Sequence, residues 1–263
     1  MNEEKRIAIM ETDIRERLSP KPGDAYYLHL SDLLLALKKA ATSAPIKILD
    51  FGSGFALYRP LFPQGQYLRA DLASVPIGTG ETLGREEEYP EPDCIISAGG
   101  KVEYDSDAFD YVLSTQVLEH VRDPEIYLAE CFRLLKPGGK LFLTTHGTWH
   151  EHGSPYDFRR WTSFGLKYEL EKAGFNVLRM EKLTTGPRAM VWFLEMYLSI
   201  DAPSRKSLLG VWHWLSRFVS RPWIHRQADW LYPHCRVVAS DVEGHKIYLC
   251  LAAYAEKNCG KLD

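Results

Sequence analysis

Apolar positions between residues 26 and 183 follow two spacings that alternate along the chain. Some form short continuous runs, as in strands buried on both faces, and others recur every three or four residues, as in amphipathic helices. Strands are predicted at residues 46–51, 66–71, 93–97, 109–114, 140–145, 176–182 and 244–254, and helices at residues 26–41, 124–135 and 163–174. Strands separated by helices pair in parallel through right-handed crossovers, so the pattern predicts an α/β doubly wound sheet.

The chain is expected to form a single domain, residues 1–263, with two additions to this alternating core. Residues 1–44 are predicted to form an N-terminal helical lid, and residues 184–243 break the alternation and indicate a helical insertion before the last strand. Aromatic residues mixed with arginine and histidine over residues 192–232 leave three interpretations open. This segment covers a binding site or packs in the core, pairs two chains as a homodimer, or makes peripheral contact with a membrane.

Composition narrows the classes of protein to consider. The chain has 32 basic and 35 acidic residues, a net charge of −3, so no overall positive field favours nucleic acid as a partner. The charged N-terminus lacks the apolar core of a signal peptide, and a cytoplasmic location is expected. Five cysteines without a C-x-x-C pair argue against a disulfide framework or a thiolate zinc site.

A glycine-rich turn follows the first predicted strand. The segment ILDFGSGFA at residues 48–56 places Asp50 at the strand end and Gly52 and Gly54 in the turn, and Asp71 ends the next strand. Glycines there allow a ligand to approach the backbone, and an acid after the second strand faces the ribose of an adenosine cofactor. Leu57 stands where a dinucleotide-binding G-x-G-x-x-G would need its third glycine.

Together with FDYVLSTQVLEHVRDPEIYLAECFRLLKPGGKLFLTT at residues 109–145, this turn resembles the class I S-adenosylmethionine-dependent methyltransferases. The resemblance is to the small-molecule group with V-L-E-H after the fourth strand, and it covers residues 45–183 and the last strand. It implies a Rossmann-like seven-stranded sheet of order 3-2-1-4-5-7-6, with the seventh strand antiparallel. It also implies S-adenosylmethionine as cofactor.

The resemblance assigns cofactor-binding roles position by position. Gly52, Ser53 and Gly54 would pass beneath the methionine part, with Asp50 near its amino group. Asp71 would hold the ribose hydroxyls, and Leu72 would pack on the adenine. The remaining positions would close the adenine and methionine ends of the pocket: Ala98, where family members often have Asp, and Ser114, Thr115 and Gln116.

Two histidines are candidates for a general base. His120 follows the fourth predicted strand and His146 the fifth, where ligands bind in such sheets. A hydroxyl acceptor benefits from a base, and imidazole titrates in the useful range. His120 is slightly favoured, and for each the alternative is a structural role in holding a loop.

Residues 146–161, HGTWHEHGSPYDFRRW, are dense in polar and aromatic groups and are expected to form the acceptor site. The spacing H-x3-H-x-H matches no strong zinc pattern, so no metal is expected. Alternatively, Asp157 and the arginines form a local ion-pair network. The candidate acceptor residues are Trp149, His150, Tyr156, Arg159 and Arg160.

The loop and the helix after it also resemble bacterial methyltransferases associated with surface-sugar synthesis. The leading hypothesis is therefore O- or N-methylation of a sugar or another polar small molecule. The alternatives are a non-catalytic binding or scaffold protein with the cofactor fold, and an RNA or protein methyltransferase. The acidic balance of the chain weighs against RNA.

Overall fold

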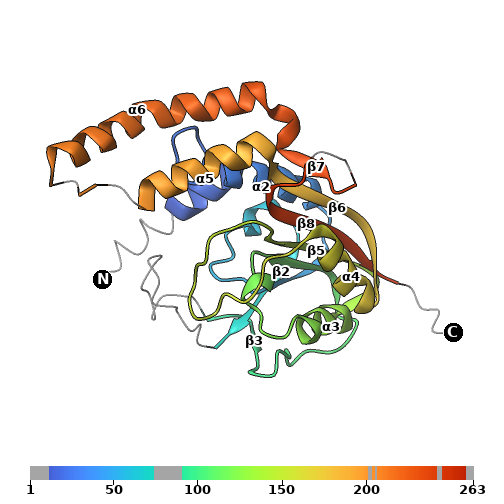
Figure 1. The fold of residues 1–263 in the computed structure, drawn as a ribbon. Coiled ribbons are helices and arrows are strands. Elements are labelled where there is room, and N and C mark those ends of the chain that lie inside the picture. Colours follow the sequence, from blue (N-terminus) through green and yellow to red (C-terminus); the bar gives the residue numbers. More distant parts are fainter. Residues whose placement is uncertain (1–11, 74–90, 201–202, 205, 242–244, 259–263) are drawn as a thin grey trace.

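A computed structural model describes residues 12–73, 91–200, 203–204, 206–241 and 245–258, and Figure 1 shows it as a ribbon. Its centre is an eight-stranded sheet of order β3-β2-β1-β4-β5-β8-β6-β7. The strands are β1 Lys47–Phe51, β2 Gln66–Leu72, β3 Cys94–Ile96, β4 Phe109–Thr115, β5 Leu135–His146, β6 Phe175–Thr185, β7 Val237–Ala239 and β8 Tyr248–Lys257. Strands β1 to β5 pair in parallel, and β8 lies antiparallel between β5 and β6.

The predicted doubly wound α/β sheet is confirmed, with one strand more than expected. β8 takes the place predicted for the seventh strand, so seven of the strands follow the implied order. The additional strand, β7, lies within residues 184–243 and pairs antiparallel with Glu181–Leu183 of β6. Its sequence, Val-Val-Ala, is too short to stand out from a helical segment by periodicity alone.

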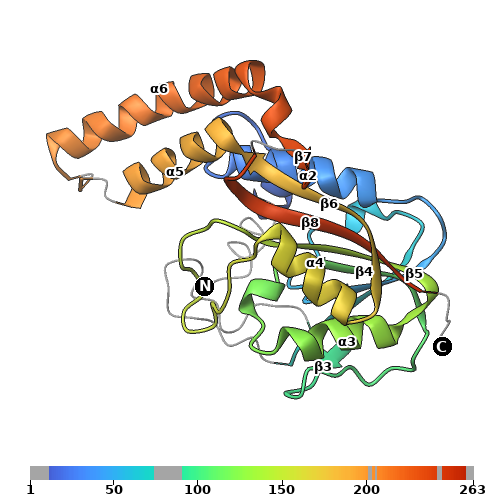
Figure 2. The ribbon, with the colours of Figure 1, turned by 45° about the vertical axis from the view of Figure 1, so that its right-hand side comes forward.

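Helices cover both faces of the sheet, as Figures 1 and 2 show. The helices are α2 Tyr27–Ala40, α3 Pro124–Leu134, α4 Ser163–Lys172, α5 Gly186–Ile200 and α6 Leu208–Leu231, with short 3-10 turns η1 Arg59–Leu61, η2 Leu118–His120 and η3 Pro233–Cys235. α3 and α4 pack on one face, and α2 and α5 pack on the other. The Thr162 side chain caps α4 by accepting the Gly165 N–H, whereas Asp123 makes no side-chain cap on α3.

Helix α2 lies within residues 1–44, predicted to form an N-terminal helical lid, and packs in the core. Leu28, Leu33 and Leu37 are fully buried against the β5–β8–β6 side of the sheet. Residues 1–11 of the predicted lid lie outside the described residues. Displacing a helix buried on this scale would expose apolar core surface to water.

Helices α5 and α6 form a hairpin that projects beyond the sheet (Figures 1 and 2). A buried ion-pair network joins it to the body: Arg188 of α5 contacts Asp32 of α2 at 3.0 Å and Asp229 of α6 at 2.8 Å. Away from this joint, the hairpin exposes Leu194, Trp212 and Trp223. None of the helices that the structure describes is long and apolar enough to cross a membrane. Membrane contact and a homodimer both stay predictions.

Candidate functional site

The carboxyl ends of β1, β2 and β4 converge on the glycine turn, as predicted. Asp50 pairs with Leu113 of β4, and Phe51 pairs with Ala70 of β2. The backbone N–H groups of Gly52 and Ser53 both donate to the Ala70 carbonyl, at 2.8 and 3.1 Å. These bonds hold the turn across the end of β2 and place the candidate cofactor residues at one edge of the sheet.

Asp50 is a buried carboxyl group with spare hydrogen-bonding capacity. The Tyr67 hydroxyl donates to Oδ2, whereas Oδ1 is buried with no hydrogen-bond partner among the described residues. Burial raises the pKa of Asp50 to about 7, opposed by the Tyr67 hydrogen bond. A buried acceptor without a donor is costly, and a ligand ammonium would satisfy it. The Ser53 hydroxyl beside it is likewise buried without a partner in the described part of the chain.

Asp71 fixes the shape of the turn from the end of β2. Its Oδ2 accepts the Gly54 N–H at 2.7 Å and its Oδ1 accepts the Leu72 N–H at 2.8 Å. Burial raises the pKa of Asp71 despite these two N–H donors. Each carboxylate oxygen accepts more than one hydrogen bond, so the group still suits a pair of ribose hydroxyls.

At the adenine end of the predicted pocket, the described residues leave Leu72 and Ala98 exposed. Leu72 is partly exposed, and Ala98 lies in an exposed turn directly after β3. Ile96 of β3 pairs with Leu72 of β2, so Ala98 follows two residues beyond that pair. The Ala98 side chain can offer an apolar contact only, unlike the Asp that family members often have there.

Gly52 is predicted to let a ligand approach the backbone. In the structure a glycine is also needed there for packing within the chain. Gly52 adopts φ +84°, and a Cβ placed there would lie 2.6 Å from Cγ2 of Val117. Val117 follows β4, so the glycine lets the loops after β1 and β4 pack against each other. Gly54 and Ala56 also have positive φ, +48° and +51°. Ala56, where the family's third glycine would stand, thus keeps a glycine-like backbone conformation.

The three residues after the centre of β4 have separate roles. Ser114 is fully buried and bonds the Tyr127 hydroxyl at 2.8 Å, which in turn donates to the Phe51 carbonyl. Ser114 therefore supports the turn from beneath and does not line the pocket as predicted. Gln116 has φ +57°, and its side chain donates to the Thr144 hydroxyl. Thr115 and Gln116 are half-buried at the strand end.

The two candidate bases differ in how their ring nitrogens are engaged. The Nδ1 of His120 lies 2.7 Å from the Tyr156 carbonyl oxygen, so Nδ1 carries the proton and Nε2 has the free lone pair. His146 is buried, with Nε2 3.1 Å from Glu119 Oε1 and Nδ1 3.2 Å from Cys250 Sγ. Burial holds the pKa of His146 well below its usual value. The geometry favours His120 as base and gives His146 a structural role.

Arg160 has no donor left for an acceptor group, contrary to the prediction. Its guanidinium donates to both carboxylate oxygens of Asp157 and to the Trp149, His150 and Arg159 carbonyls. Arg159 donates to two backbone carbonyls after η2. The alternative interpretation, a local ion-pair network, thus holds for Asp157 and Arg160 and not for Arg159. The hydrogen bonds of Arg160 tie the Trp149 and His150 backbone to Asp157.

Aromatic rings from three elements stack beside the histidines. Trp149 lies 4.2 Å from the His146 ring and 4.1 Å from the Trp192 ring of α5, measured between centroids, and 4.8 Å from His29 of α2. His150 is stacked near Trp192, and Tyr156 is exposed on the loop. Trp149 and His150 therefore lie where the loop contacts α5, a position compatible with the predicted acceptor site.

Sequence reasoning missed four residues of this region: Tyr67, Glu119, Trp192 and His29 as a member of the aromatic stack. Glu119 lies inside the Leu-Glu-His motif, and its burial depends on the fold. Tyr67 alternates with Leu68 in β2, so its direction toward Asp50 follows from strand register. Trp192 belongs to a helix whose placement the alternating pattern does not determine.

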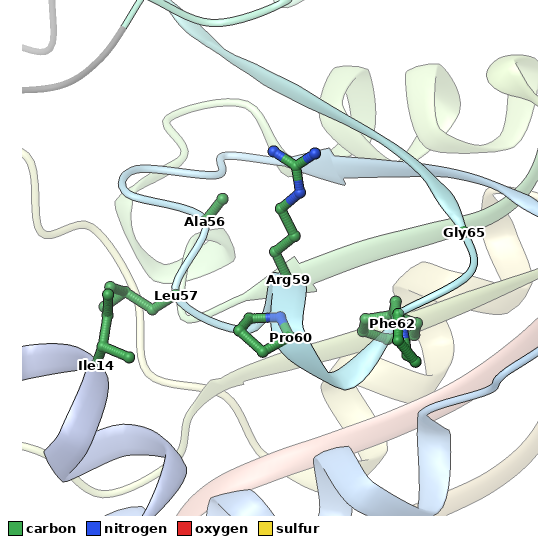
Figure 3. A pocket seen from close by; sticks show the side chains of 8 residues that line it. Ile14, Ala56, Leu57, Arg59, Pro60, Phe62 and Gly65 are labelled. Carbon is green, nitrogen blue, oxygen red and sulfur yellow. The ribbon is translucent and has the colours of Figure 1, made fainter.

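Two cavities flank this edge of the sheet. One, of about 430 Å³, lies between Ile14 and the segment from Ala56 to Gly65, and Figure 3 shows Leu57, Arg59 and Pro60 around it. The other, of about 540 Å³, is lined by Asp123, Arg159 and Arg160, among others. Neither has Asp50 or Asp71 in its lining, so neither is the candidate cofactor site itself.

Comparisons with known proteins agree with this geometry. Residues 49–143 match the family described as "Methyltransferase domain". The ubiquinone biosynthesis O-methyltransferase of Xanthomonas oryzae pv. oryzae is 34% identical over 104 residues, 39% of this chain and 44% of that protein. That of Methylococcus capsulatus is 33% identical over 127 residues, 47% and 54% of the two chains. The chain thus spans about half the length of these curated relatives.

Solved structures show the same fold over nearly the whole chain. A Haemonchus contortus phosphoethanolamine N-methyltransferase 2 in complex with S-adenosyl-L-methionine has a TM-score of 0.52 and 18% identity, covering 95% of this chain and 56% of that one. The [4+2]-cyclase SpnF has a TM-score of 0.52 and 16% identity, covering 97% and 93%. Residues 49–143 are therefore similar to a methyltransferase domain, and the chain shares its overall fold with these solved structures.

Proposed function

We propose that the chain binds S-adenosylmethionine at the glycine turn and methylates a hydroxyl group of a small ring-shaped acceptor, such as a sugar. The observation that carries the proposal is the buried Asp50 carboxylate, whose Oδ1 has no partner in the described chain, at the meeting point of β1, β2 and β4. Asp71, at the end of the neighbouring strand β2, supplies a second acid at the same edge of the sheet, so that one acid would bind the cofactor's ammonium group and the other its ribose.

The cofactor, when bound, supplies an electrophilic methyl group, and the protein's task is to align and deprotonate the acceptor. His120 presents Nε2 as a proton acceptor because Tyr156 fixes its other nitrogen. Trp149 and His150, which are half-buried, provide aromatic rings for a sugar or another ring, and the buried Trp192 supports them from behind. The named activity of the O-methyltransferase relatives supports oxygen over nitrogen as the methylated atom.

The test is methyl transfer from labelled S-adenosylmethionine to a library of sugars and phenols. The wild type is expected to label at least one acceptor class. His120→Gln should lower turnover on the order of 100-fold while leaving cofactor affinity within about twofold. His234→Gln, at an exposed histidine remote from the turn, is the matched control. Full activity in His120→Gln would remove this residue as the base.

The alternatives make different predictions in the same assay. A binding or scaffold protein would bind the cofactor and label none of the acceptors. An RNA or protein methyltransferase would label those polymers and leave the small molecules unlabelled. The net charge of −3 supports the small-molecule acceptor, because phosphate-backbone binding depends on clustered positive charge.

A further inference from the structure

We propose that Glu119, His120 and His152 form a binding site for one divalent transition-metal ion such as Zn²⁺. Each residue offers one donor atom, and these atoms lie within 4.8 Å of one another. The spacing within residues 146–152 does not predict a metal, because two of the three donors come from the 3-10 turn η2. The fold brings that turn and the loop together.

Both imidazoles present Nε2 as a free donor atom. The His120 Nδ1 is 2.7 Å from the Tyr156 carbonyl oxygen, and the His152 Nδ1 is 3.3 Å from the His150 carbonyl oxygen. Metal-binding histidines commonly donate their second ring N–H to a carbonyl or carboxylate, which fixes the tautomer and aims the other nitrogen. In both histidines Nδ1 lies near a backbone carbonyl oxygen, which is the arrangement expected of two metal-binding imidazoles.

Glu119 supplies the negative charge of the site. It is fully buried, its Oε2 accepts the Thr145 hydroxyl at 2.8 Å, and Oε1 lacks a hydrogen-bond donor in the described structure. Nε2 of His146 lies 3.1 Å from Oε1 but does not form a hydrogen bond with it. Buried carboxylates are paired with a cation or coordinate a metal, and a divalent ion would supply that charge.

The backbone holds the two loops at this distance. Gly153 has φ +66°, and a Cβ there would lie 3.3 Å from Cε1 of His120. His152 is tied by its N–H to Asp157, which Arg160 holds with two hydrogen bonds. Tetrahedral zinc donors lie about 3.3 Å apart, given bonds of about 2 Å, so binding requires the donors to close by about 1.5 Å at most.

Two nitrogens and one carboxylate oxygen select the class of metal. Imidazole-rich sets suit Zn²⁺, Co²⁺ or Fe²⁺, whereas Mg²⁺ prefers oxygen donors. Three protein ligands leave a coordination position open, as in catalytic zinc sites. This inference rests on the proposed function in one respect: an ion held there would supply Lewis-acid chemistry to an acceptor hydroxyl, and His120 Nε2, which accepts the proton in the ion-free chain, would hold the ion when it is bound.

The experiment titrates the tag-free full chain with Co²⁺, followed by absorption and by competition with Zn²⁺. One ion per chain is expected, with the spectrum of a four- or five-coordinate nitrogen-containing site. His152→Gln should weaken affinity on the order of 100-fold, and His150→Gln, in the same loop but outside the cluster, should not. Mg²⁺ at equal concentration should not displace Co²⁺.

Equal Co²⁺ affinity in wild type and His152→Gln would overturn the proposal, as would displacement by Mg²⁺ or an octahedral spectrum without nitrogen ligands. S-adenosylmethionine binding is measured on the same samples. It is expected to be unchanged in His152→Gln. If the metal site is absent and the chain still binds S-adenosylmethionine, the proposed function stands and the metal proposal fails. If the chain binds Co²⁺ and does not bind S-adenosylmethionine, the metal proposal stands and the proposed function fails.

Discussion

The sheet body and the α5–α6 hairpin differ in how their surfaces are used. The body buries its apolar residues on both faces of the sheet, and several of its buried polar atoms have no partner in the described structure, among them Asp50 Oδ1, Ser53 Oγ and Glu119 Oε1. The hairpin exposes large apolar side chains along its length and is joined to the body near its base, by the ion pairs of Arg188 and by buried residues such as Trp192. The chemistry of cofactor binding thus lies in the body, and the hairpin contributes mainly Trp192 to the acceptor side.

The largest effect is expected at the joint between these two regions. Arg188→Met removes a fully buried guanidinium and leaves Asp32 and Asp229 without that partner. Breaking a buried pair from one side costs about 3–5 kcal/mol of unfolding free energy. Urea denaturation measures it. Lys167→Met is the control, because its partner Glu171 is 52% exposed and surface pairs contribute less than about 1 kcal/mol.

If Arg188→Met changed stability no more than Lys167→Met, the hairpin would be held by apolar packing alone. The ion pairs of Arg188 would then contribute nothing to holding the hairpin on the sheet body.

The next effect lies in the glycine turn. Gly52→Ala places a methyl group against Val117 and forces a positive φ on alanine, so a loss of about 2–4 kcal/mol is expected in urea denaturation. Gly99→Ala is the matched control, since the nearest atom to a new Cβ there is 3.9 Å away. Adding Val117→Ala to Gly52→Ala should recover part of the loss through the shared contact. Strictly additive losses would mean that Val117 does not impose the glycine.

A smaller effect concerns pH. The pKa of Asp50 is raised to about 7 by burial, and the ionised form is the one that binds an ammonium group. Cofactor affinity should therefore rise about tenfold between pH 6 and pH 8, as the ionised fraction grows. Asp50→Asn should flatten this profile in calorimetry. Tyr67→Phe should move it to higher pH, because the Tyr67 hydrogen bond lowers the pKa. A profile that falls with pH would contradict the role of Asp50.

The smallest effect is expected on the exposed face of the hairpin. Trp212 and Trp223 are 66% and 62% exposed, so replacing both by alanine should change unfolding free energy and cofactor affinity by about 0.5 kcal/mol or less. Trp192→Ala, in the same hairpin but buried, should cost about 3–5 kcal/mol. A large loss from the exposed pair would show that this face is covered in solution.

The sequence predicts the sheet well because buried parallel strands and their helices leave a strong local signal. The strand ends at Asp50 and Asp71 were placed from such runs, and the structure brings them together. The sequence does not predict β7, because three residues are too few to show the alternation of apolar and polar positions that marks a strand. The sequence wrongly predicts that Arg160 and Ser114 bind a ligand. In the structure Arg160 pairs with Asp157 through the conformation of the loop, and Ser114 bonds Tyr127 beneath the sheet. Side-chain direction in such places is set by tertiary contacts that a residue pattern does not contain.

Calorimetric titration of the full chain with S-adenosylmethionine tests the central claim most directly. The account predicts one binding event per chain, weakened at least about tenfold in Asp71→Asn because a charged hydrogen-bond acceptor is lost. Circular dichroism of the variant checks that the fold is retained. Absence of binding at millimolar cofactor, or equal affinity in wild type, Asp71→Asn and Asp50→Asn, would contradict a cofactor site at the ends of β1, β2 and β4.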